Sequence, residues 1–516
     1  AGPPRDPHPC KPRATRRVRP PSRICPWPRF RRRVSPRRFM QMRGMRGFFA
    51  ILLPALLTVA GGESPGLRGS EVDQVLVFDA GSSGTRIHVF NIRASEDSTA
   101  HVPLIDLSVR AKQTMKVKPG LSDFAQRDDT EGAGRNIAQL LDFANQFVPE
   151  SRRATTPALL KATAGLRSVS EAKAEAVLDS VRRTLSASGY QFKPEWAGII
   201  KGKEEGGLAW VAANYLEGTL NEESAQTLGV IEMGGGSTQV TFQVSPSDEL
   251  DPDDDFVFES AQGKRFRLYA HSYLGFGQDH AQAAMRGLLD PSGADPCYPK
   301  GYARHPASGG EGKFVQGSGD SSVCMAEIGR RLWPTSAMAP GRYAKERPLS
   351  GRFVATENFF YTQADEKLGW EDRLLSLADL ESAARGVCGK ELAEAGGAET
   401  ADPGVPKTCF GFAYQAELLK AIKATTNLVQ VFVKHKIHGG DIDWALGAAL
   451  IHHIRFVQGS AAEPALVPAW AVVLLVVLGS FACVRALMHF PHTRNVVAQV
   501  TGLSPTKIGS STYPAE

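Results

Sequence analysis

Cysteine is scarce in this 516-residue sequence, which has seven, and the N-glycosylation sequon Asn-x-Ser/Thr does not occur at all. Without a sequon, N-glycosylation offers no guide to location. Cys10 and Cys25 precede a first apolar run, and Cys483 lies in a second one. No two of the remaining cysteines have C-x₂-C spacing, which disfavours a zinc site. These four are Cys297, Cys324, Cys388 and Cys409.

The four central cysteines suit two disulfides in an oxidising compartment. Four cysteines allow three pairings, and the sequence alone leaves all three open. Short loops favour the pairs Cys297–Cys324 and Cys388–Cys409.

Acidic residues are almost absent from residues 1–46, which hold 15 Lys or Arg against the single Asp6. The whole chain carries +6 and this arm +14, which leaves −8 for the rest. An acidic body argues against nucleic-acid binding and suits a site whose charge is set by a bound cation. Two interpretations of the Pro/Arg-rich arm stay open. It is a nucleic-acid-binding arm, or it is an artefact upstream of a start at Met40, Met42 or Met45.

Long apolar runs are few, and two of them indicate the secretory pathway. Residues 47–62, after several basic residues, have the pattern of a signal peptide, with cleavage expected near residues 60–63 and an uncleaved anchor as the alternative. Residues 466–484 contain no charge and are long enough to span a bilayer. The basic residues in 485–516 predict a cytosolic tail. The chain is therefore expected to be a single-pass type I membrane protein.

Two stretches share an apolar strand, an acid, a Gly/Ser/Thr turn and a second strand. Residues 74–89 read QVLVFDAGSSGTRIHV, and residues 228–244 read LGVIEMGGGSTQVTFQV, with Asp79 aligned to Glu232. Glycines let backbone N–H groups approach a ligand, and consecutive turn amides form an anion-binding nest. The acids suit a metal ion or its waters. The pair predicts two lobes that hold a phosphate chain and its cation, although two ordinary hairpins are the alternative.

Two further stretches carry polar groups next to expected helix starts. LLKATAGLRSV, residues 159–169, could present amides and the Thr163 hydroxyl to a phosphate, or it is a plain strand-to-helix turn. GIIKGKEEGGLAWVAANYL, residues 198–216, places Glu204 and Glu205 just before an expected helix start at Gly206. Such an acid either interacts with the helix dipole or takes a proton from an attacking water.

Strand and helix patterns mix from residue 74 onward and predict α/β lobes. We expect lobe I at 72–195, completed by about 436–458, and lobe II at 196–435. The Gly/Ser/Pro-rich spans 291–322 and 394–407 read as loops. Helices are expected at 132–148, 171–187, 206–217, 279–289 and 411–435, and strands at 74–78, 87–92, 197–201, 228–231 and 239–244.

Five segments, in this order, resemble the signature motifs of the apyrase family, the nucleoside triphosphate diphosphohydrolases. They are DAGSSGTR, KATAGLR, GKEEGGLAW, EMGGGSTQ and DWALGAAL, within residues 74–455. HSYLGFGQDHA, residues 271–281, and the four central cysteines resemble the endoplasmic reticulum and Golgi diphosphatase branch. The resemblance implies two ribonuclease-H-like lobes of the actin, Hsp70 and hexokinase type. Each lobe would have a five-stranded sheet, with a nucleotide cleft between them.

The resemblance also implies roles for individual residues. Glu205 would activate water, while Asp79 and Glu232 would hold Mg²⁺ or Ca²⁺ through water. Trp444 would pack near the cleft floor. The family usually has Asp where this chain has Glu232, and the extra methylene shifts the carboxylate by about 1.5 Å. The phosphate-binding residues would be Gly81, Ser82, Ser83, Gly84, Thr85, Arg86, Thr163, Gly165, Gly234, Gly235, Gly236, Ser237, Thr238 and Gln239.

The implied activity is metal-dependent hydrolysis of the terminal phosphate of nucleoside diphosphates, with triphosphates as further candidate substrates. It would take place in the lumen of the secretory pathway, with the Golgi or endoplasmic reticulum favoured over the cell surface. A sugar kinase or exopolyphosphatase of the same superfold and a weakly active nucleotide-binding ectodomain stay as alternatives. The run Phe359-Phe360-Tyr361 suits either stacking on a base or a core strand.

Overall fold

The computed structural model describes residues 72–93, 100–108, 113–222, 225–289, 294–304, 315–332, 349–391 and 405–458. All of these belong to one compact unit. The basic arm, the expected signal peptide at 47–62, the expected membrane segment at 466–484 and the tail at 485–516 lie outside the described residues. Within the described ranges, no helix combines the length and apolar character needed to cross a bilayer.

The first lobe is built on a sheet in the order β3-β2-β1-β5-β6, with β4 also paired to β2. Residues 75–78 of β1 are all buried, as expected for a central strand covered on both faces. Both β3 and β4 pair with the edge of β2 that faces away from β1, so together they fill one strand position. The strands are β1 (Asp73–Ala80), β2 (Thr85–Arg93), β3 (Leu104–Ile105), β4 (Thr114–Val117), β5 (Ala158–Ala162) and β6 (Ala197–Ile199).

The second lobe repeats this arrangement in the order β14-β13-β7-β8-β10-β9. In both sheets a hairpin of two antiparallel strands is followed by a third antiparallel strand on one side and two parallel strands on the other. The extra edge strand β9 makes six strands, where five were expected. The strands are β7 (Gly229–Met233), β8 (Ser237–Gln243), β9 (Asp255–Glu259), β10 (Arg265–Leu274), β13 (Gly351–Glu357) and β14 (Val429–Val433).

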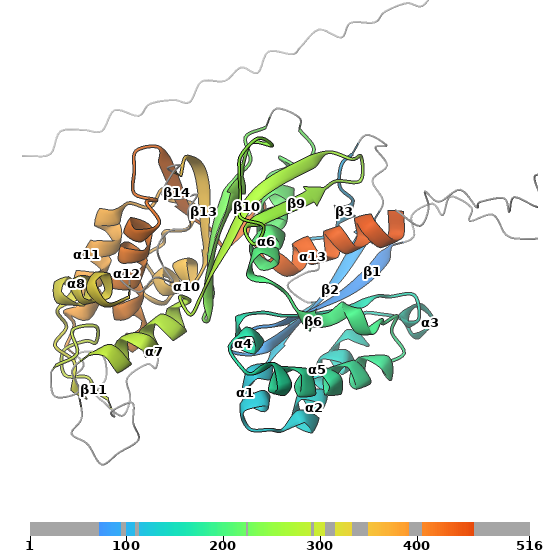
Figure 1. The fold of residues 1–516 in the computed structure, drawn as a ribbon, viewed down its shortest axis with the longest axis horizontal. Helices are drawn as coiled ribbons and strands as arrows, with labels where there is room; N and C mark the ends of the chain where they lie inside the picture. The colour runs from blue at the N-terminus through green and yellow to red at the C-terminus, as the bar shows by residue number, and fades with distance from the viewer. Residues whose placement is uncertain are drawn as a thin grey trace, which may run out of the picture. The chain divides into compact units, whose positions relative to one another are not determined.

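Helices cover the sheets (Figure 1). Apolar side chains of the sheets and helices together form three buried clusters. In the first lobe the helices are α1 (Leu121–Gln126), α2 (Thr130–Ala144), α3 (Glu150–Arg153), α4 (Ala164–Arg167) and α5 (Glu171–Ser186). The second lobe has α7 (Gln278–Leu288), α8 (Ser321–Arg331), α10 (Asn358–Asp365), α11 (Leu377–Cys388) and α12 (Val405–Ala421). Short elements are η2 (Pro194–Trp196), η4 (His453–Gln458), β11 (Ala303–Arg304), β12 (Val315–Gln316), β15 (Lys436–Ile437) and β16 (Gly440–Asp441).

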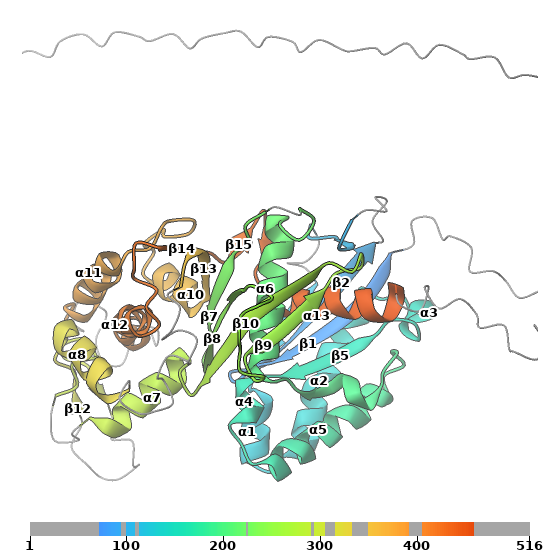
Figure 2. The same cartoon turned by 45° about the horizontal axis from the view of Figure 1, so that its top comes forward.

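Two helices, α6 (Gly202–Glu217) and α13 (Trp444–His452), pack on each other and connect the lobes (Figure 2). α6 contacts the second sheet, and α13 contacts β1 and β2 of the first. Their crossing is close, because a Cβ on Gly447 would lie 2.1 Å from the Leu208 carbonyl oxygen. This requirement explains the glycine in the DWALGAAL segment.

Several expected boundaries need correction. The helix expected over 411–435 ends at Ala421, and strand β14 follows, because the β-branched run at 429–433 pairs with β13. The helix expected at Gly206 begins at Gly202, so Glu204 and Glu205 lie in its first turn. The expected loop at 291–322 contains β11 and the start of α8. Phe359 belongs to helix α10, which rules out the core-strand interpretation.

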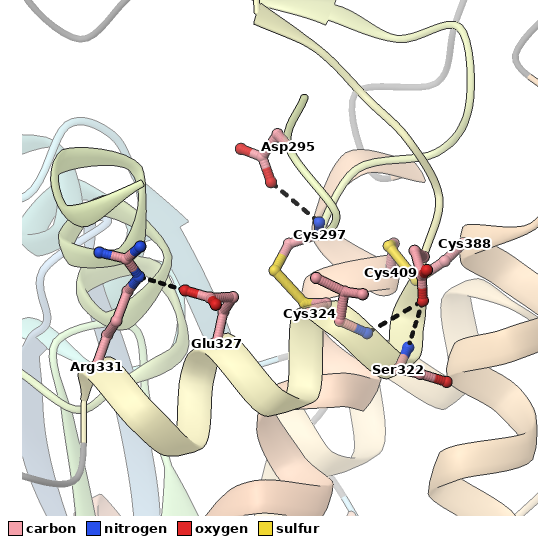
Figure 3. The surroundings of a disulfide bond; sticks show 10 residues. Asp295, Cys297, Ser322, Cys324, Glu327, Arg331, Cys388 and Cys409 are labelled. Carbon is pink, nitrogen blue, oxygen red and sulfur yellow. Dashed lines mark hydrogen bonds and ion pairs between the residues drawn. A yellow bond between two sulfur atoms is a disulfide. The ribbon is translucent and has the colours of Figure 1, made fainter. Parts of the chain in front are cut away.

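Both expected disulfides form in the second lobe. Cys297–Cys324 joins the segment before α8 to that helix, and Asp295 accepts a hydrogen bond from the Cys297 backbone N–H at 3.0 Å (Figure 3). Cys388–Cys409 joins the end of α11 to α12. The pairing that short loops favour is therefore confirmed.

Candidate active site

The two glycine-rich hairpins have the same local geometry. In the first, strand β1 pairs Asp79 with Arg86 of β2, and the Gly81 N–H donates to the Gly84 carbonyl at 3.1 Å. In the second, strand β7 pairs Glu232 with Gln239 of β8, and the Gly234 N–H donates to the Ser237 carbonyl at 3.0 Å. The predicted alignment of the two turns, with Asp79 at the position of Glu232, is therefore confirmed.

Both hairpins line one cavity. The turn of the second hairpin comes close to side chains of the first hairpin and of α4. A Cβ on Gly235 would lie 3.0 Å from the Ser82 Oγ, and a Cβ on Gly236 would lie 2.8 Å from the Ala164 Cβ. The turn amides of both lobes are thus arranged around one small, polar space, as an anion-binding nest requires.

Glu205 lies in this cavity at the first turn of α6, with 7% of its surface exposed. Its carboxylate forms an ion pair with Arg167 and accepts a hydrogen bond from Gln239 Nε2 at 3.0 Å. Arg167 and Gln239 also donate to the Ser237 Oγ, at 3.2 and 2.7 Å. Burial raises the pKa of Glu205, against the opposing effect of the Arg167 charge. A carboxylate that is fixed in position by neighbouring side chains and has a raised pKa is suited to accept a proton from water.

Asp79 and Glu232 face the same cavity from the two lobes. Burial, and then the charge of Asp443, raises the pKa of Asp79 well above its ordinary value. Burial, and then the charge of Glu205, does the same to the pKa of Glu232. The Oε2 atom of Glu232 is buried and has no hydrogen-bond partner among the described residues. The charge of Arg86 opposes the rise in the pKa of Asp79, whereas the carboxylate charges around Glu232 all raise its pKa further.

The family follows from a comparison with known proteins. A family model described as the GDA1/CD39 (nucleoside phosphatase) family matches residues 68–462. The chain belongs to this family. Its expected resemblance to apyrases is confirmed, and so is its assignment as an enzyme that hydrolyses nucleoside phosphates.

Related proteins align in sequence with most of the length of this nucleoside phosphatase. It is 33% identical over 420 residues to "Probable apyrase 5" of Arabidopsis thaliana, across 75% of this chain and 83% of the relative. It is 31% identical over 388 residues to "Nucleoside diphosphate phosphatase ENTPD5" of Homo sapiens, across 72% of this chain and 86% of the relative. A crystal structure of nucleoside triphosphate hydrolases from Neospora caninum aligns with a TM-score of 0.54 at 16% identity, across 75% and 93% of the two chains. That likeness supports the two-lobed α/β fold.

Most of the predicted site residues of the nucleoside phosphatase meet at the cavity, but four do not line it. Thr85 is fully buried beneath the first turn, and Thr238 donates to the Phe276 carbonyl at 2.7 Å. Gly165 packs against Ser82, and Gln239 reaches the cavity through Glu205 and Ser237, which both line it. Trp444 lines the cavity with 4% of its surface exposed, as expected for a residue near the cleft floor.

Three residues at the site were missed by the sequence reading. Lys116 of β4 donates to the Ser83 Oγ at 3.0 Å, and no motif marks its short strand. Asp443 caps α13 through the Ala445 N–H at 2.8 Å and lies 3.1 Å from the His88 Nε2. It belongs to DWALGAAL, where only the tryptophan was given a role. Glu357 is the last residue of β13, whereas Asp79 and Glu232 come one residue before the end of their strands, and an acid near the end of a buried strand was a signal for it.

An adjoining cavity of about 450 Å³ extends from the hairpins toward α10 and α12. It shares Ser83, Lys116 and Glu357 with the first cavity, so the two cavities adjoin. Tyr361 lines it, whereas Phe359 is buried and Phe360 stacks on His435. Of the three aromatic residues singled out in the sequence, Tyr361 alone lines this cavity.

The donor set fits a divalent cation. Carboxylate oxygens are the ligands that Mg²⁺ and Ca²⁺ prefer, and the unpartnered Glu232 oxygen needs a positive charge. In the described ranges, no group of three acidic, histidine or cysteine side chains is arranged to coordinate an ion directly. The residues therefore suit an ion held largely through water and the substrate. Five carboxylates line the cavity against Arg86 and Lys116, namely Asp79, Glu205, Glu232, Glu357 and Asp443.

Proposed function

We propose that this nucleoside phosphatase hydrolyses the terminal phosphate of nucleoside diphosphates, and also of triphosphates, with Mg²⁺ or Ca²⁺ bound. The observation that supports it most is that Glu205, a buried carboxylate held by Gln239, lines the same cavity as the two glycine-rich hairpins. The relatives carry the names apyrase and nucleoside diphosphate phosphatase, which agree with this chemistry. The 450 Å³ cavity beyond the hairpins has room for a nucleoside, with Tyr361 placed to stack on its base.

In this proposal the turn amides and hydroxyls of the two hairpins hold the phosphate chain from opposite lobes. Glu205 takes a proton from water while the water oxygen forms a bond to the terminal phosphorus. The bond from that phosphorus to the bridging oxygen breaks, and the bridging oxygen stays with the nucleoside monophosphate. Arg167 and Gln239 orient Glu205 throughout. A bound cation would neutralise phosphate charge, and Asp79 and Glu232 are the residues that would hold it.

Phosphate release from a panel of UDP, GDP, ADP and ATP, with inorganic polyphosphate as the comparison, tests the substrate class. We expect release from the nucleotides, with the diphosphates hydrolysed faster. Release from polyphosphate alone would overturn the proposal and favour an exopolyphosphatase.

We further propose that the body lies in the secretory-pathway lumen, anchored by residues 466–484. The support is the apolar sequence of that segment and of residues 47–62, together with two disulfides, which form in oxidising compartments. Protease protection in intact microsomes tests it. The body should be protected, and digestion of the body before the membrane is opened would contradict this topology.

A further inference from the structure

Glu357 is a carboxylate at the site to which the proposed mechanism gives no role. It is the last residue of β13, which runs parallel to β7 with Thr356 paired to Glu232. The ends of neighbouring parallel strands meet at one edge of a sheet. Glu357 therefore lies one residue beyond the level of Glu232. It lines the main cavity and the 450 Å³ cavity as well.

The backbone at Glu357 gives no reason for a glutamate. Its φ of +59° and ψ of −116° lie in a region that favours glycine. Its side chain does not cap helix α10, and it makes no hydrogen bond or ion pair with the described residues. A residue kept in a strained conformation without a local structural task is a candidate for function.

The surroundings of Glu357 indicate what that function is. The negative charges of Asp443 and Asp441 act on Glu357, and so do the positive charges of Arg86 and Lys116. Both cations are shared with Asp79, and Arg86 also lies 3.9 Å from Asp443, so two positive charges face the five carboxylates of the main cavity. A further negative charge on the wall of a site for an anionic substrate is unfavourable unless it faces a cation.

A second observation supports a cation at this place independently of the number of acids. Glu232, more than nine-tenths buried, lines the same cavity, and its buried Oε2 has no hydrogen-bond partner among the described residues. A buried, unpaired carboxylate oxygen is costly unless a positive charge approaches it.

We propose that Glu357 is a third cation-anchoring carboxylate, which holds the water shell of a divalent ion together with Asp79 and Glu232. This inference rests on the proposed metal-dependent hydrolysis. It assigns Glu357 to a positioning role, because the ion and its waters would stand between this side chain and the substrate.

The test measures Mn²⁺ binding to the full chain without nucleotide, by the electron paramagnetic resonance signal of free Mn²⁺. Glu357→Gln should weaken Mn²⁺ binding about tenfold or more, as loss of an outer-shell carboxylate does. The Mn²⁺ concentration for half-maximal hydrolysis should rise in parallel. Binding of UDP in excess chelator should stay equal or tighten, because one repelling charge is gone.

Two further variants keep the test decisive. Glu357→Gly suits the positive φ, so it should fold at least as well and still lose Mn²⁺ affinity. Glu371→Gln changes the same chemistry at an exposed position outside both cavities and should leave Mn²⁺ binding unchanged.

Unchanged Mn²⁺ affinity in Glu357→Gln and Glu357→Gly, with a metal-dependent wild type, would overturn the role of Glu357 and leave the proposed function intact. A raised KM for UDP but not for methyl diphosphate, with Mn²⁺ binding unchanged, would instead assign Glu357 to the ribose hydroxyls. A wild type that binds no Mn²⁺ and works in chelator would overturn this inference together with the metal dependence.

Discussion

Two adjacent glutamates at the start of α6 have different tasks. The Glu204 carboxylate accepts a hydrogen bond from the Lys201 N–H at 2.7 Å and so satisfies a backbone donor at the start of α6. Glu205 points instead into the cavity, because neighbouring positions on a helix are rotated by about 100°. Arg167 and Gln239 hold it there. The helix-start interpretation of these acids therefore fits the first glutamate, and the catalytic proposal concerns the second.

We expect Glu205→Gln to lower the rate of phosphate release by about 10²–10⁴-fold, because the amide cannot accept the proton of the attacking water. Binding of a non-hydrolysable diphosphate analogue should survive, since the hairpins make the phosphate contacts. Glu204→Gln is the matched control and should stay near the wild-type rate, because the amide oxygen of glutamine can still accept the hydrogen bond from the Lys201 N–H. Near wild-type release from Glu205→Gln would rule out its role as the base.

At the scale of elements, the crossing of α6 and α13 connects the catalytic helix to the rest of the molecule. Gly447 of α13 lies against the backbone of Leu208, which follows Glu204 by about one turn of helix on α6. Backbone atoms cannot give way as a flexible side chain can. The position of Glu205 therefore depends on how closely the two helices approach.

Gly447→Ala should lower the free energy of unfolding by about 1–3 kcal/mol, the usual cost of overpacking. It should also lower turnover, because α6 carries Glu205. Gly287→Ala is the matched control. Gly287 lies in α7, where an added Cβ would meet no heavy atom within 4 Å, so alanine there should be neutral or stabilising. Urea unfolding of both variants checks this, and a Gly447→Ala protein as stable as wild type would contradict the close crossing.

The disulfide Cys388–Cys409 joins α11 to α12 across 21 residues of sequence. Replacing both cysteines with alanine should lower the free energy of unfolding by about 2–4 kcal/mol, because the unfolded chain gains the freedom of the opened loop. Thermal unfolding with and without reductant measures it, and reductant should then have a smaller effect on the variant than on wild type. Free thiols at both positions in non-reduced peptides of the wild type would contradict this prediction.

The sequence predicted the elements that a few adjacent residues determine. The hairpins at Asp79 and Glu232 were found because each joins a strand, an acid and a glycine-rich turn within a few residues. The prediction of one continuous helix over 411–435 was wrong, because residues 429–433 form a strand that pairs with β13. Such pairing depends on residues far away in the sequence, at 351–355, which a local pattern does not contain.

At the scale of the whole molecule, the site exists because one strand order occurs twice and the two copies contribute to one cavity. Lys116, Glu357 and Asp443 reach that cavity from β4, β13 and the start of α13, which are remote in sequence from both hairpins. Their roles follow from the assembly of the lobes rather than from spacing along the chain. Glu357 had a sequence signal as an acid at the end of a buried strand, and Asp443 had one as the first residue of DWALGAAL.

Removal of divalent cations should affect the whole molecule as well as the chemical step. Five carboxylates and two cationic side chains line the cavity, so a phosphate chain without a cation meets net repulsion from both lobes. With excess chelator, hydrolysis should fall at least about a hundredfold, because the cation supplies several kcal/mol of charge stabilisation.

A nucleotide that is held by both hairpins should stabilise both lobes together, but only when the cation is present. At about 100 times its Kd, a ligand adds roughly 2.7 kcal/mol to the free energy of unfolding, and thermal unfolding detects this easily. Glu205→Gln is the useful protein for this measurement, because it should bind the nucleotide without consuming it. We expect its Tm to rise with UDP and Mg²⁺ and to stay unchanged with UDP and chelator. Equal stabilisation in both conditions, or rapid turnover by the wild type in chelator, would show that the acidic cavity binds phosphate without a metal ion.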